Sequence, residues 1–107
     1  MAYDEKLALR LRRALKDVAA TEKHMFGGLA LMVRGHMACG IIGEKLMVRV
    51  GPEAHEGALK RPCTAPMDFN GKPMKGMVYV TGRGATGAAL KAWVALALKF
   101  NATLPPK

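Results

Sequence analysis

The chain has 107 residues, 50% of them hydrophobic and 23% charged, with a formal net charge of +9. This length and composition predict a single globular domain, residues 1–107, with its own hydrophobic core, and are too small for two domains. The first residues carry no apolar signal segment, and no apolar stretch is long enough to span a bilayer. We therefore expect a cytoplasmic protein without a membrane partner.

The positive charge is unevenly distributed along the chain. Residues 1–59 carry a net charge of +2, whereas residues 60–107 carry +7 with a single acidic residue, Asp68. An excess of this kind favours an anionic partner such as nucleic acid, although a solvated lysine-rich surface would produce the same count. Both interpretations remain open at this point.

The first half of the chain predicts one helix followed by an antiparallel meander. Apolar residues recur at helical spacing from about Tyr3 to Ala20. Alternating apolar runs then predict short strands, which two-residue connections containing glycine, Arg34-Gly35 and Gly43-Glu44, join as hairpins. The predicted strands cover residues 22–26, 28–33, 36–42 and 45–50. Alternation predicts three sets of core residues, each on one side of its strand: Leu29, Leu31 and Val33; Met37, Cys39 and Ile41; and Leu46, Val48 and Val50.

The second half predicts a short helix, a hairpin and a final helix. Pro52 suits the first turn of a helix over residues 53–60. Asn70-Gly71 is a strong turn signal between strands at 66–69 and 74–80. The last helix covers about 86–100, and residues 101–107 form a tail. The fold class is therefore a two-layer α+β domain, α-β(3–4)-α-β(2)-α, with its helices on one face of an antiparallel sheet.

No catalytic centre is predicted. Gly82 to Gly87 fits the pattern G-x-G-x-x-G, but a dinucleotide site needs a further parallel strand and an acidic residue about 20 positions on, and neither follows. Backbone amides at the start of the final helix could instead bind a phosphate or another anion. That weaker hypothesis involves Arg83, Gly84 and Thr86.

Metal, cofactor and nucleophile signals are also lacking. The histidines (His24, His36 and His55) and the two cysteines (Cys39 and Cys63) do not have the spacing of metal ligands, and the chain contains no serine. Cys39 is predicted to be buried and Cys63 to lie in a loop, with no disulfide framework. Proximity of His55 to Cys63 in space remains open. We expect no cofactor and no metal.

Basic residues supply the candidate nucleic-acid interface. One group lies on the first helix and another surrounds the predicted second hairpin: Arg10, Arg13 and Lys16, and Lys60, Arg61, Lys72 and Lys75. Such residues neutralise phosphates and give salt-dependent binding with little sequence selectivity. No base-reading motif is present, so DNA would be contacted mainly through its backbone.

A second hypothesis is a binding module for a protein or small ligand. The final helix carries a wide apolar stripe, with Trp93, Leu96 and Phe100 on one face and apolar residues on the adjacent one. This stripe could contact a protein partner or a second copy in a homodimer. The predicted meander is also rich in methionine, which adapts to varied partners but is more common in cores.

Several segments resemble the N-terminal domain of the TfoX/Sxy family, from about Leu7 to Pro106. The segments are Met25-Phe26-Gly27-Gly28 with the strand after it, Lys45-Leu46-Met47-Val48-Arg49-Val50, Pro66-Met67-Asp68-Phe69 with Gly71-Lys72-Pro73-Met74, Leu90-Lys91-Ala92-Trp93 and Leu104-Pro105-Pro106. The resemblance implies an α+β domain with a secretion-chaperone-like layout and a link to regulators of natural competence, which assist transcription. It implies no catalytic residues. Regulators of the family carry a second, C-terminal domain. Because the resemblance to the N-terminal domain covers nearly all of these residues, we expect a stand-alone single-domain member.

Overall fold

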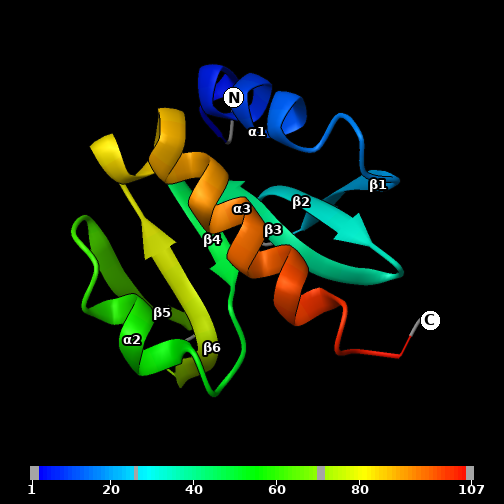
Figure 1. Ribbon diagram of the computed structural model, residues 1–107. Coiled ribbons are helices and arrows are strands. Elements are labelled where there is room, and N and C mark those ends of the chain that lie inside the picture. Colours follow the sequence, from blue (N-terminus) through cyan, green and yellow to red (C-terminus); the bar gives the residue numbers. More distant parts are fainter. Residues whose placement is uncertain (1–2, 26, 70–71, 106–107) are drawn as a thin grey trace.

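The computed structural model describes residues 3–25, 27–69 and 72–105, which form one antiparallel sheet and the helices that cover it (Figure 1). The sheet has six strands in the order β1-β2-β3-β4-β6-β5, and every neighbouring pair is antiparallel. In chain order the elements are α1 (Glu5–Ala14), β1 (Ala20–Met25), β2 (Gly28–Val33), β3 (His36–Ile42), β4 (Lys45–Arg49), α2 (His55–Leu59), β5 (Thr64–Phe69), β6 (Lys72–Val80), the 3-10 turn η1 (Gly82–Ala85) and α3 (Gly87–Asn101). The predicted fold class and element order are confirmed.

The turns of the meander form where the glycines indicate. Arg34 and Gly35 between β2 and β3 have φ angles of 58° and 83°, the left-handed pair that a type I′ hairpin requires. The predicted Asn70-Gly71 turn lies outside the described residues. No helix among those described is long and apolar enough to cross a membrane.

Several boundaries differ from the prediction, among them the starts of β1, β5 and β6 and both ends of α2. Helix α1 ends at Ala14 rather than near Ala20, because the chain turns after Leu15 so that β1 can pair with β2 from Ala20 onward. At its start Asp4 caps the helix, since its carboxylate accepts hydrogen bonds from the Lys6 amide at 2.8 Å and the Leu7 amide at 3.2 Å. At the other end of the chain Asn101 belongs to α3, so the tail begins one residue later than predicted.

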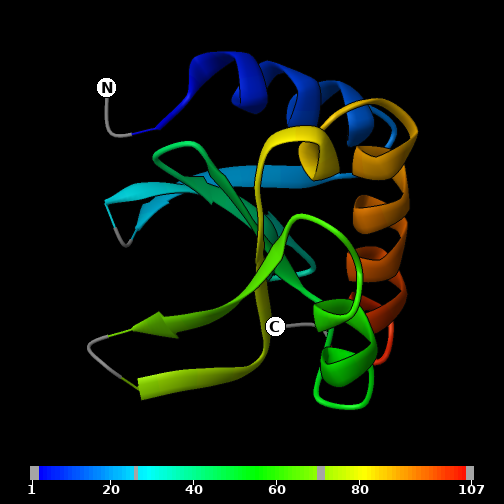
Figure 2. The same cartoon turned by 90° about the vertical axis from the view of Figure 1, so that its left-hand side faces the viewer.

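The main core lies between the sheet and the helices, which gather on one side of it (Figure 2). Alternation correctly placed the inward residues of β2 and β4, and it placed Cys39 and Ile41 of β3. The assignment of Met37 to that side was wrong. The register of β2 with β3 shifts between Leu31 and Met32: Leu31 pairs with Cys39, whereas Met32 pairs with Met37. Ala38 is therefore an extra residue in β3, and it turns Met37 to the other face of the sheet.

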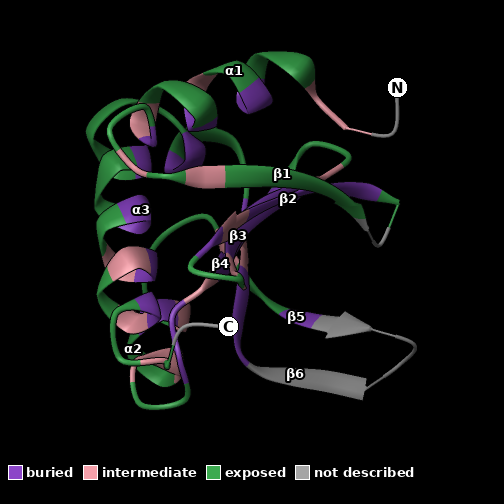
Figure 3. Cartoon of the chain, turned by 90° about the vertical axis from the view of Figure 1, so that its right-hand side faces the viewer, coloured by how far each residue is buried: buried purple, intermediate pink, exposed green. Residues whose placement is uncertain are grey.

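The face of the sheet away from the helices carries a second, smaller core of methionines. Met47, Met67 and Met77 are buried there, packed against half-buried Met37, Ile42 and Tyr79. Gly40 leaves room for the Met47 side chain, because a Cβ at this position would lie 2.8 Å from the Met47 methyl group. In Figure 3 most of β3 and β4 is coloured as buried, as expected for strands that have a core on each face of the sheet. These buried methionines therefore pack the domain rather than form an open surface.

Polar contacts join the end of α3 to the β2–β3 hairpin. The Asn101 side chain, which is 2% exposed, donates to the Val33 carbonyl at 2.9 Å. Arg34 donates to the Asn101 carbonyl at 2.8 Å, and His36 Nε2 lies 2.6 Å from the Pro105 carbonyl. The last turn of α3 and the segment after it are therefore fixed to this hairpin.

Candidate nucleic-acid interface

The exposed face of α1 carries the first group of candidate cations. Leu7, Ala8 and Leu11 are buried against the sheet, and the 100° step of a helix then directs Lys6, Leu9 and Arg13 away from it. All three are exposed, and Leu9, at 47%, is the single large hydrophobic side chain exposed among the described residues. Lys16, in the turn after α1, is exposed as well.

Two other arginines of α1, Arg10 and Arg12, form hydrogen bonds within the domain. Arg10 is half-buried and donates to the Ala85 carbonyl at 3.3 Å, so it joins α1 to η1. Arg12 makes two hydrogen bonds with the Glu22 carboxylate, at 2.6 Å and 2.8 Å. This pair raises the pKa of Arg12, and the same hydrogen bonds hold the pKa of Glu22 below its usual value. Of the α1 candidates, Arg13 and Lys16 are therefore the freely accessible ones.

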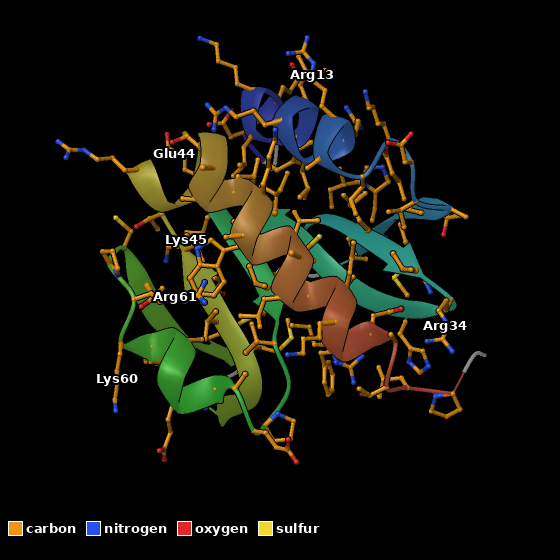
Figure 4. The ribbon with its side chains drawn as sticks, viewed as in Figure 1. Arg13, Arg34, Glu44, Lys45, Lys60 and Arg61 are labelled. Atoms are coloured by element: carbon orange, nitrogen blue, oxygen red, sulfur yellow. The ribbon has the colours of Figure 1, made fainter. Side chains whose placement is uncertain are left out.

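The second group of candidates lies elsewhere. Figure 4 shows Lys60 and Arg61 beside α2, well away from Arg13 on α1. The Arg61 guanidinium lies 4.9 Å from the centre of the Trp93 ring, where it stacks on a buried aromatic residue of α3. Lys72 and Lys75 belong to β6, but their side chains lie outside the described residues. The described candidates therefore form two separate groups rather than one continuous patch.

The Gly82 to Gly87 segment packs closely against neighbouring residues at Gly84. Residues Gly82–Ala85 form η1, and Gly84 is buried where a Cβ would lie 2.6 Å from a Val80 methyl and 3.0 Å from the Cys63 Cβ. The Thr86 hydroxyl donates to the Arg83 carbonyl at 3.0 Å and does not cap α3. Arg83 is exposed. The first amides of α3 have no side-chain cap, so anion binding by Arg83, Gly84 and Thr86 stays a prediction.

Neither metal nor Cys–His chemistry gains support from the geometry. Across residues 3–25, 27–69 and 72–105, no group of three His, Cys, Asp or Glu side chains could hold a metal ion. His55 Nε2 is buried without a hydrogen-bond partner in this part of the chain. The hydrogen bonds of the described residues include none between His55 and Cys63.

The two cysteines are expected to react very differently. Cys39 is 1% exposed, and burial raises its pKa to about 12, so almost no reactive thiolate forms at neutral pH. Cys63 is exposed and unpaired with Cys39. A disulfide-exchange reagent such as Ellman's reagent should therefore modify one thiol per chain in the native protein and both in denaturant. Two rapidly reacting thiols in the native protein would contradict the burial of Cys39.

Together, the fold and its surface define a small basic α+β domain, with an open antiparallel sheet covered on one face by helices and its described candidate cations in two separate groups. The model of the TfoX N-terminal domain family matches residues 11–101, and the chain belongs to this family. No curated protein and no solved structure matched the chain.

Proposed function

We propose that this TfoX N-terminal domain is a non-enzymatic regulatory domain that associates with nucleic acid through the exposed face of α1. One observation carries the proposal. Lys6, Arg13 and Lys16 are exposed on or beside one face of α1, and none of them has a carboxylate partner within 4.0 Å among the described residues. Such cations are available to neutralise phosphates.

The surroundings of this face support the same proposal. Arg83, also exposed, belongs to η1, which Arg10 joins to α1. With a net charge of +9, the whole chain would also attract a polyanion at low salt.

The expected mode of binding is contact with the phosphate backbone. The outward residues of α1 are two cations and one leucine, and the chain carries no known base-reading motif. Lysine and arginine contacts to phosphates position a protein without selecting sequence. We therefore expect similar affinity for unrelated duplexes and a strong dependence on salt.

The double substitution Arg13→Gln with Lys16→Gln tests the proposal. Fluorescence anisotropy with a labelled DNA duplex should show affinity reduced by about tenfold or more near 0.1 M salt. The slope of log affinity against log salt should become shallower by about 1.8, since each lost phosphate contact removes about 0.9. Both side chains are exposed, so the fold should be unaffected.

The matched control is Lys60→Gln with Lys99→Gln. It also removes two positive charges, but from exposed positions near α2 and the end of α3. If α1 is the interface, the control should retain most of the affinity. An equal loss in both variants would mean that only net charge matters, and no binding by the unaltered protein at low salt would reject nucleic-acid association altogether.

A further inference from the structure

A cavity of about 350 Å³ lies between the C-terminal half of α3 and the turn that follows β4. It is distinct from the α1 face, and nothing in the proposed function uses it. Its lining residues come from two segments of the chain: Val50, Gly51, Pro52, Glu53 and Ala54, and Leu96, Lys99, Phe100 and Thr103. Its size is that of a site for a small molecule.

The floor of the cavity is apolar and held in place. Val50 is 3% exposed, and Leu96 and Phe100 are half-buried against the main core or beside it. Gly51 has a φ of 87°, and any Cβ at this position would clash with the Phe100 ring. The Arg49 guanidinium lies 5.5 Å from the centre of the same ring. The glycine thus lets the ring lie directly on the backbone, which shapes the floor before any ligand arrives.

The rim of the cavity carries one charge of each sign. Glu53 and Lys99 are both exposed, and within the described part of the chain they form no ion pair with each other. The Thr103 hydroxyl donates to the Phe100 carbonyl at 2.6 Å, which leaves its oxygen able to accept another hydrogen bond. A ligand that complements this lining carries an anion, a cation and an apolar group.

We propose that this cavity binds a small zwitterion with an apolar side group, namely an apolar α-amino acid. The side group would lie on Val50, Leu96 and Phe100. Lys99 would pair with the carboxylate and Glu53 with the ammonium group. Because each charged group meets its complement beside an apolar surface, neither half of such a ligand is left without a partner.

Two-dimensional amide NMR spectra of the whole chain, titrated with L-leucine or L-phenylalanine, test the assignment. Saturable shifts are expected at residues 50–54 and 96–103. The matched ligands 4-methylpentanoate and isopentylamine each lack one charge of leucine, and glycine lacks the side group. Each should bind about tenfold more weakly than leucine, since each loses one charge-assisted or apolar contact. Equal binding of isopentylamine and leucine would overturn the assignment of Lys99.

Single substitutions at the rim separate the two charges. Lys99→Gln should weaken leucine by about tenfold and leave isopentylamine unchanged, while Glu53→Gln should weaken leucine and leave 4-methylpentanoate unchanged. The matched controls Lys91→Gln and Glu56→Gln change exposed residues that do not line the cavity. No shifts at about 10 mM leucine, or shifts elsewhere on the domain, would overturn the proposal. The DNA-binding test does not depend on this result.

Discussion

Trp93→Ala is expected to reduce the free energy of unfolding by about 3–5 kcal/mol, the usual loss when a buried aromatic side chain is removed. Trp93 is 3% exposed and lies in the main core between α3 and the sheet. Its ring also supports the Arg61 guanidinium, 4.9 Å from the ring centre. Removing the ring therefore leaves a cavity in the core and frees the arginine at once.

Urea denaturation followed by far-ultraviolet circular dichroism measures this effect, since Trp93 is the one tryptophan of the chain and fluorescence would be lost. Trp93→Phe is the matched control and should be much milder, because most of the volume remains. Arg61→Ala isolates the cation–π contact and should cost about 0.5–1 kcal/mol. A loss below about 1 kcal/mol for Trp93→Ala would contradict the burial of the ring.

Asn101→Ala is expected to reduce the free energy of unfolding by about 1–3 kcal/mol. Its amide donates to the Val33 carbonyl at 2.9 Å, in a position only 2% exposed. Alanine would remove this buried hydrogen bond and leave a gap where the amide packs. The same denaturation experiment applies, and Thr103→Ala, at an exposed residue two positions on, should change stability by no more than about 0.5 kcal/mol.

Asn101→Asp gives the isosteric test of the same hydrogen bond. A protonated aspartic acid can still donate to Val33, whereas the carboxylate would face a carbonyl oxygen in a buried site, so the folded protein raises the pKa of this Asp above its ordinary value near 3.9. The variant should therefore approach wild-type stability below pH ~3.9 and lose stability as pH rises toward the raised pKa. A pH-independent difference would show that the amide is not the donor.

Much of the fold follows from short-range pattern. Alternation identified the inward residues of β2 and β4, and Arg34-Gly35 marked a turn whose two positive φ angles the structure confirms. The prediction for Met37 was wrong because a register shift moves a side chain to the other face, and one strand's alternation cannot reveal its partner's register. Helix α1 was predicted too long, since apolar spacing continues through Leu15 and Val18 after the helix has ended.

The candidate sites could be predicted only in part. Residue type identified Arg10, Arg12, Arg13 and Arg61 as cations, but their roles depend on what lies beside them in space. Arg12 pairs with Glu22 and Arg10 with the Ala85 carbonyl, 75 positions along the chain. Sequence reasoning placed Leu96 and Phe100, which line the cavity at α3, on an apolar stripe that could contact a partner. It could not predict the cavity itself, because the two lining segments lie more than 40 residues apart. In the other segment Gly51-Pro52 was the one local signal, and it predicted only a helix start.

The sequence by itself determined the α+β class, the family, the hairpin turns of the meander and the burial of Cys39, because each depends on neighbouring residues or on periodicity along one element. The tertiary structure alone decided that the described candidate cations form two separate groups, that methionines fill a second core on the far face of the sheet, and that Asn101 joins α3 to Val33. Each of these depends on contacts between residues far apart in the chain, and a linear pattern carries no information on such distances.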